Sequence, residues 1–221
     1  MFTKATEAVG RYLCAVMDPS DAEQKEILGQ GCMLNERSVL TALHVVERLS
    51  RNGGIIVNGS IGMWTASVNW KSEAADLALL QLEVPRKGDH DLVLPQSFPT
   101  ISANSLRLGM QLGYSSLLTT LDKFEEHPYL PQCFHSGWVS RQVHGKDHIV
   151  YLLSPGYITL SFSGAPVFFD TGELCGVLLG PDHLIAKQPG PPGSRHLAEY
   201  DFFYPRVLAL EPLRTEISQH I

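Results

Sequence analysis

Short apolar or alternating segments recur along the chain, each of strand length and rich in valine, isoleucine, leucine and aromatic residues. Turn-forming residues separate them, and no helical pattern alternates with them as a βαβ fold would require. This pattern predicts an all-β sandwich or barrel fold. The candidate strands are GRYLCAVM (10–17), EILGQGCML (26–34), SVLTALHVV (38–46), GGIIVNGSI (53–61), WTASVNW (64–70), DLALLQLE (76–83), LRLGMQLGY (106–114), HIVYLLSP (148–155), APVFF (165–169), ELCGVLLG (173–180) and FFYPRVLAL (202–210).

A polar, proline-containing stretch at 86–105 separates the first six candidate strands from the later ones. It predicts two β halves, 1–105 and 106–221, with the boundary near residue 105. Residues 187–196 (KQPGPPGSRH) are expected to form a surface loop, because proline has no N–H to donate to a sheet. Near the C-terminal end, Leu213 and Ile217 stand four apart among polar residues, which predicts a short helix.

Composition is that of a folded globular protein: 221 residues, 44% of them hydrophobic and 18% charged. The formal net charge is −6 and no run of Lys or Arg occurs, which argues against a nucleic-acid partner. No apolar stretch approaches membrane-spanning length, and Lys4, Glu7 and Arg11 interrupt the region where a signal peptide would need an apolar core. We therefore expect a cytoplasmic protein with no membrane partner.

The four cysteines, Cys14, Cys32, Cys133 and Cys175, lie far apart among apolar neighbours. Reduced, buried thiols are expected, although the sequence leaves a disulfide pair open. His127, Cys133 and His135 fit no standard zinc spacing and lack an evident fourth ligand. The sequence accordingly predicts no metal and no cofactor.

One serine stands in a tight turn between two apolar runs, in LSFSGAPVFFDTGELCGV (160–177). A hydroxyl such as that of Ser163 becomes a useful nucleophile only when a base takes its proton and a third group orients that base. His44 follows an apolar strand and is expected at its end, and Asp76 stands where a polar run meets a buried strand. The order His, Asp, Ser differs from that of subtilisin and of the α/β-hydrolases. Asp91 is the rival acid, and without these partners Ser163 is simply a turn hydroxyl.

These segments resemble the trypsin-like serine proteases of the chymotrypsin fold, in particular their intracellular branch without a signal peptide. LTALHVV resembles the family's segment around the catalytic histidine, DLALLQL its Asp-Leu-Ala-Leu-Leu strand, and FSGAPVFFDTGELCGV its nucleophile turn and the two strands after it. The resemblance covers the chain from about Gly10 to the terminal helix. It implies two six-stranded antiparallel β-barrels followed by a short C-terminal helix.

By the same resemblance, His44 is the general base, Asp76 orients it and Ser163 is the nucleophile of a serine endopeptidase. The N–H groups of Ser161 and Ser163 would form the oxyanion hole. A protein or peptide substrate would pair with the strand through Leu178, Leu179 and Gly180. The primary pocket would be lined by these residues together with Tyr157, Ile158, Thr159 and Leu160. Because Tyr157 stands where basic-specific relatives carry an acid, we expect cleavage after apolar or small residues.

Three positions depart from the family pattern. Ser161 replaces a glycine whose N–H must face the oxyanion, Ala165 replaces a second glycine, and Phe162 replaces the acid that pairs with a newly cut N-terminus in secreted relatives. Activation by N-terminal cleavage is therefore not expected. Ser161 also leaves open an alternative, a pseudoprotease or regulatory peptide-binding module in which no oxyanion hole forms. A regulatory protein partner is compatible with either function, and an esterase using the same triad is a third, weaker interpretation.

Overall fold

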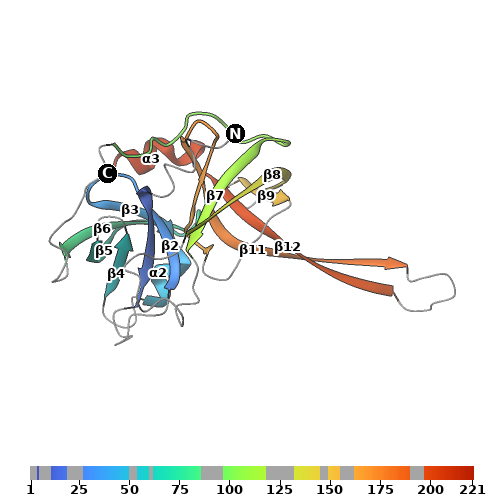
Figure 1. The fold of residues 1–221 in the computed structure, drawn as a ribbon, viewed down its shortest axis with the longest axis horizontal. Helices are drawn as coiled ribbons and strands as arrows, with labels where there is room; N and C mark the ends of the chain where they lie inside the picture. Colours follow the sequence, from blue (N-terminus) through green and yellow to red (C-terminus); the bar gives the residue numbers. More distant parts are fainter. Residues whose placement is uncertain are drawn as a thin grey trace.

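A computed structural model of the chain describes residues 4, 11–18, 27–49, 54–59, 62–85, 97–117, 132–144, 149–154, 162–189 and 197–221. Within these ranges the chain forms two closed antiparallel β-barrels of six strands each (Figure 1). The expected fold class, all-β with two six-stranded barrels and a short C-terminal helix, is confirmed.

The first barrel has the strand order β1-β2-β3-β6-β5-β4. Its tightest packing lies in β1 and β3, whose residues are all buried. The strands are β1 (Leu13–Met17), β2 (Ile27–Met33), β3 (Ser38–Ala42), β4 (Ile55–Gly59), β5 (Gly62–Ser72) and β6 (Leu77–Pro85).

The second barrel has the order β10-β11-β12-β9-β8-β7. Its strands are β7 (Gln111–Leu117), β8 (Gln132–His144), β9 (Ile149–Ser154), β10 (Pro166–Phe168), β11 (Leu174–Pro189) and β12 (Leu197–Ala209). The expected boundary near residue 105 falls in the segment between β6 and β7 and stays a prediction. Part of this segment runs along the second barrel, because Ile101 bridges Leu174 in parallel.

Three elements differ from the sequence-based expectation. Strand β8 matches none of the candidate strands. Residues 43–46, expected at the end of a strand, open the helix α2 (Leu43–Leu49). Residues 187–189, expected in a loop, are the last residues of β11, where Lys187 pairs with Glu199. The rest of that expected loop, 190–196, lies outside the described residues.

One buried hydrophobic cluster spans both barrels, and the second barrel also has a cluster of its own. Phe168, Leu174 and Val177 of the second barrel pack in the same buried cluster as the core of the first. The chain then returns to the first barrel through η4 (Glu211–Leu213) and α3 (Arg214–Ser218). Ile217 of α3 is fully buried in this shared cluster, so the C-terminal helix helps to join the barrels.

The last residues reinforce this return by three contacts with the first barrel. The side-chain amide of Asn69 on β5 donates to the carbonyl of His220 at 3.1 Å, and the ring of Trp70 stacks on that of His220. Asn35, after β2, donates through its side chain to the carbonyl of Ile221 at 3.3 Å. The end of the described chain is therefore fixed to the barrel that carries His44 and Asp76.

One part of the second barrel extends well beyond both barrels. Figure 1 shows β11 and β12 continuing as a long two-stranded arm, drawn in orange and red. The pairing between them runs without interruption from Pro181 opposite Pro205 to Pro189 opposite Leu197. This pairing begins directly after Gly180, the last residue of the strand predicted to bind substrate.

Candidate active site

His44 and Asp76 meet at the end of the first barrel. His44 is the second residue of α2, directly after β3, and Asp76 immediately precedes β6. Imidazole Nδ1 lies 2.7 Å from Oδ2 of the carboxylate, and the backbone N–H of His44 donates to Oδ1 at 2.9 Å. Both side chains remain about one-third exposed, at 31% and 34%. A carboxylate in this position fixes the ring and holds the Nδ1–H tautomer, leaving Nε2 to accept a proton.

The backbone of Asp76 has an unusual conformation that serves the same contact. Its φ is +53°, the one positive value among the described non-glycine residues. Its carbonyl accepts the N–H of Leu43 at 2.9 Å, while its side chain accepts that of His44. Asp76 thereby satisfies two N–H groups of the first turn of α2, which have no partner within the helix. Aspartate tolerates this backbone region better than most residues.

Ser163 lies on a tight turn between β9 and β10 that faces the first barrel. The carbonyl of Ser163 accepts the N–H of Gln30 on β2 at 2.8 Å. Ser163 itself is only 6% exposed. Thr41, three residues before His44, donates its hydroxyl to the carbonyl of Gln30 at 2.6 Å. The turn that carries Ser163 therefore docks on the strands that lead to His44.

Two glycines allow this close approach. A Cβ at Gly164, where φ is +86°, would overlap the carbonyl oxygen of Gln30 and the hydroxyl of Thr41. A Cβ at Gly29 would lie 2.5 Å from both γ-carbons of Val45 and 3.0 Å from the carbonyl oxygen of Ser163. Gly29 is therefore the point where α2 and the Ser163 turn meet. The helix of His44 and the turn of Ser163 are neighbours across the two barrels.

An aromatic cluster lies behind the turn. Phe162 is buried at 1% exposure, and its ring lies 5.7 Å from that of His135 on β8. The ring of His135 stacks at 5.3 Å on Tyr114 of β7. Burial lowers the pKa of His135, which favours the neutral imidazole that suits this apolar position. Phe162 thus anchors the Ser163 turn through packing.

The strand next to Ser163 carries a β-bulge. Leu178 donates its N–H to Ala165 and accepts the N–H of Gly164, so its backbone groups are already used. The register between β11 and β12 then shifts between Leu178 and Pro181. Arg206 donates from Nη2 to the carbonyl of Leu179 at 3.0 Å, which satisfies an acceptor that the bulge leaves out of the ladder.

Gly180 completes the bulge and lies against the candidate nucleophile. Its φ is +97°, and a Cβ built on it would lie 3.4 Å from the hydroxyl oxygen of Ser163. A glycine suits this position because side chains are strained at such angles. The bulge therefore turns β11 past Ser163 and toward the arm.

Several predicted site residues lie outside the described residues. Among them are Ser161 of the expected oxyanion hole and four expected lining residues of the primary pocket, Tyr157, Ile158, Thr159 and Leu160. The same holds for Asp91, the rival acid, and for His127. Of the residues expected to bind substrate, the structure describes Leu178, Leu179 and Gly180, all beside the Ser163 turn.

Cys14, Cys32 and Cys175 are free thiols buried in the two barrels, and burial raises the pKa of Cys14 to about 12. Burial also raises the pKa values of Cys32 and Cys175. Within the described ranges, no group of three or more His, Cys, Asp or Glu residues could hold a metal ion. These cysteines are placed as buried apolar residues.

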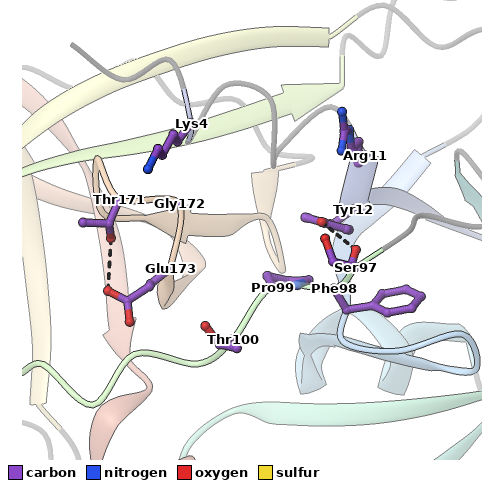
Figure 2. Close-up of a pocket in the computed structure, with 10 residues that line it drawn as sticks. All are labelled: Lys4, Arg11, Tyr12, Ser97, Phe98, Pro99, Thr100, Thr171, Gly172 and Glu173. Atoms are coloured by element: carbon purple, nitrogen blue, oxygen red, sulfur yellow. Dashed lines mark hydrogen bonds between the residues drawn. The ribbon is translucent and has the colours of Figure 1, made fainter.

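A separate cleft of about 280 Å³ lies between the N-terminal segment, the connection between the barrels and the turn after β10 (Figure 2). Tyr12 donates to the carbonyl of Ser97 at 2.6 Å on one side, and Thr171 donates to Glu173 at 3.1 Å on the other. The cleft contains neither His44 nor Ser163 among its lining residues. No histidine lines this cleft, so it lacks the imidazole base of the candidate triad and is not the candidate active site.

Three solved structures share this fold. The inactive form of a serine-to-alanine mutant of Rv3671c from M. tuberculosis H37Rv has a TM-score of 0.64 at 14% identity, over 98% of this chain and 89% of that one. The serine endoprotease from Yersinia pestis has a TM-score of 0.63 at 17% identity, over 99% of this chain but 65% of that one. The apo form of the MamO protease domain from Magnetospirillum magneticum has a TM-score of 0.62 at 15% identity, over 96% and 98%.

These likenesses show that the chain has the fold of the trypsin-like serine proteases. No protein-family model matches the chain, and no curated protein matches it in sequence. In the part of the chain that the structure describes, no helix has both the length and the apolar character needed to cross a membrane.

Proposed function

We propose that this chain is a serine endopeptidase that uses His44, Asp76 and Ser163. The observation that carries the proposal is the 2.7 Å contact between His44 and Asp76, beside the docked turn of Ser163. A base held in one tautomer at the junction of two barrels is the arrangement that activates a serine hydroxyl. The shared fold with serine proteases supports a protein or peptide substrate.

In the proposed reaction, Ser163 Oγ forms a bond to the carbonyl carbon of the scissile peptide and its proton passes to Nε2 of His44. When the C–N bond breaks, His44 returns that proton to the departing amine. Water then attacks the ester, with His44 again taking and returning a proton, and the new C-terminus leaves as a carboxylic acid. Asp76 orients the imidazole and stabilises the imidazolium.

The developing oxyanion would be bound by the N–H groups of Ser161 and Ser163. The two following N–H groups already have acceptors: Gly164 donates to Leu178 at 2.7 Å and Ala165 to Phe162 at 3.0 Å. The substrate strand would pair from Gly180 onward, because Leu178 is bonded to the turn itself. An apolar or small residue is proposed before the scissile bond.

A second candidate is a binding or regulatory module with the same fold. The observation that favours it is the burial of Ser163, which is 6% exposed and lies against Gly180. An endopeptidase must expose the hydroxyl of Ser163 to the carbonyl carbon of its substrate. A binding module needs no such exposure.

Reaction with a fluorophosphonate separates the two. We expect the wild-type protein to become labelled at Ser163, and both Ser163→Ala and His44→Ala to abolish labelling. Ser102→Ala is the matched control, because Ser102 is also buried but lies in the connection between the barrels. Absence of labelling in the folded wild type favours the binding module, and labelling that survives Ser163→Ala places the nucleophile elsewhere.

A further inference from the structure

The arm formed by β11 and β12 continues the edge of the sheet that lies beside Ser163. β10 pairs with this edge of β11 as far as Val177, and the turn before β10 bonds to Leu178 through Gly164 and Ala165. From Leu179 to Pro189, no described strand pairs with that edge. The same edge therefore runs from the turn of Ser163 out along β11, whose arm is visible in Figure 1.

The register shows which backbone groups of the arm are free. Pro181 lies opposite Pro205, and two prolines cannot exchange N–H···O bonds, so this is a non-hydrogen-bonded pair. Hydrogen-bonded and non-hydrogen-bonded pairs alternate along an antiparallel ladder, so every second residue after Pro181 repeats its orientation. The N–H and C=O groups of His183, Ile185 and Lys187 therefore point away from β12, toward the open edge.

The other side of the ladder gives the same parity. Leu178 bonds to Gly164 and Ala165, so its backbone groups point away from β12 and its pair with Val207 is a non-hydrogen-bonded one. The backbone groups of Val207 therefore face β9, with which β12 pairs on its other side. Pro205 lies two residues before Val207 and faces the same way, away from β11. The bulge opposite Arg206 adds one residue to β11, so that Pro181 lies opposite Pro205 in a second non-hydrogen-bonded pair.

A two-stranded ribbon is only marginally stable in water, and a third strand normally completes it. We propose that the edge of β11 from Pro181 to Pro189 pairs with the residues of an extended polypeptide substrate that precede the scissile bond. This inference rests on the proposed endopeptidase function. It assigns the substrate class as long, unfolded polypeptide rather than short peptide.

The direction of the substrate follows from β10, which pairs with this edge in the antiparallel sense. A substrate that continues β10 along the edge also runs antiparallel to β11. Its C-terminal part then reaches Ser163 and its N-terminal part lies on the arm. At about 3.3 Å per residue, the stretch from Pro181 to Pro189 adds roughly 30 Å of pairing surface.

The open edge of β12 is the less suitable alternative. That edge continues from the pairing with β9 at Arg206, Val207 and Leu208, on the far side of the ribbon from β10. A strand added there would not lead to Ser163. Continuity with the nucleophile turn therefore selects the edge of β11.

The test uses two diphenyl phosphonates of leucine that react with the nucleophile. One carries about two residues before the leucine and the other about ten alternating threonine and glutamine residues, long enough to cover the arm. We expect the wild-type protein to be labelled about tenfold faster by the long probe, because several backbone hydrogen bonds are added. Equal rates for the two probes would overturn the proposal.

An arm-shortened variant tests whether the arm causes the difference. Replacing residues 183–203 by Asn-Gly joins Asp182 to Tyr204, which lie opposite each other and form the hydrogen-bonded pair that a two-residue turn requires. The short probe should label this variant at the wild-type rate, and the long probe should lose its advantage. An advantage that persists without the arm contradicts the proposal.

Two proline substitutions distinguish the edges in the intact arm. Ile185 and Asp201 lie opposite each other, and their N–H groups point to opposite edges of the ribbon. Ile185→Pro removes a donor from the proposed edge and should reduce the advantage of the long probe severalfold. Asp201→Pro is the matched control and should leave it unchanged. The reverse result would place the polypeptide on β12 and overturn the assignment.

Other outcomes separate this inference from the proposed function. If neither probe labels Ser163, the endopeptidase proposal fails. The pairing surface is then tested by the affinity of the ten-residue peptide without its phosphonate, measured for the wild-type and the arm-shortened protein. Binding about tenfold tighter to the wild type supports the pairing surface, and equal affinities overturn it. Self-association that depends on the arm, without any effect of probe length, assigns the edge to a second copy and also overturns it.

Discussion

The carboxylate of Asp76 contacts His44 twice, through Oδ2 to the imidazole at 2.7 Å and through Oδ1 to the backbone N–H at 2.9 Å. One side chain therefore orients the ring and also caps the helix that carries it. The first contact concerns the proposed chemistry and the second concerns stability. The two roles can be separated by substitution.

Asp76→Asn keeps an oxygen for the backbone N–H of His44 and a residue that tolerates positive φ. Its amide group can favour the wrong imidazole tautomer, and it removes the negative charge. We expect the labelling rate at Ser163 to fall by about 10³-fold or more, with little loss of stability. Asp76→Ala should in addition lower the free energy of unfolding by about 1–3 kcal/mol. Unchanged labelling in Asp76→Asn would contradict the orienting role.

Gly164→Ala tests the docking of the nucleophile turn on the first barrel. The new Cβ would overlap Gln30 and Thr41 at a position with φ of +86°. We expect a loss of about 3 kcal/mol or more in the free energy of unfolding, measured by urea titration. Gly109→Ala is the control, because its φ is +81° but nothing lies within 4 Å of the added atom. That variant should lose about 1–2 kcal/mol, the backbone cost alone.

His135 gives the stability of the fold a dependence on pH. Burial lowers its pKa in the folded state, so the unfolded chain takes up this proton more readily. The stabilisation is fully present above the unfolded value of about 6.5 and is lost as the pH falls through the folded pKa. The Tm should therefore drop more steeply in acid for the wild type than for His135→Phe, which cannot be protonated. Parallel curves would show that His135 contributes nothing to the acid sensitivity.

The buried thiols should resist modification in the native protein. Cys14 and Cys32 are fully buried, and Cys175 is 2% exposed. Because burial also raises their pKa values, little thiolate is present at neutral pH. We expect iodoacetamide to modify these three residues roughly 100-fold more slowly in the native state than in urea, as followed by peptide mass spectrometry. Rapid native modification of Cys14 would show that the first barrel opens readily.

The fold class could be predicted because strand-length apolar segments repeat along the chain, and the predicted double barrel is confirmed. Helix α2 was missed because its opening residues, LHVV, are as typical of strands as of helices. Its first N–H groups are capped by Asp76, 32 residues later in the chain. A cap that comes from so far along the sequence leaves no local signal.

Strand β8 was missed for a different reason. Trp138 is 47% exposed on this strand, so the apolar and polar positions do not alternate cleanly between the two faces. Its place is set by long-range pairing, for example of Gln111 with Trp138 and of His144 with Ile149. The arm was not predicted, because the prolines in this region are typical of turns and loops. Pro181 and Pro189 are nonetheless compatible with a strand edge that has no partner.

The candidate site could be predicted in part. Motif order alone brought together His44, Asp76 and Ser163, and the structure places the first two in contact and the third on a turn docked beside them. Their catalytic roles stay a prediction. The role of Gly29 between α2 and the Ser163 turn could not be predicted, because this approach depends on how two distant segments pack.

The buried position of Ile217 has a consequence for how the protein is made. The ribosome synthesises this helix after all twelve strands, yet its side chain fills the core that joins the barrels. A nascent chain therefore carries His44 and Ser163 long before the contacts that fix their barrels together are complete. The contacts by which Ile217 helps to join the two barrels can form only after this segment has been synthesised.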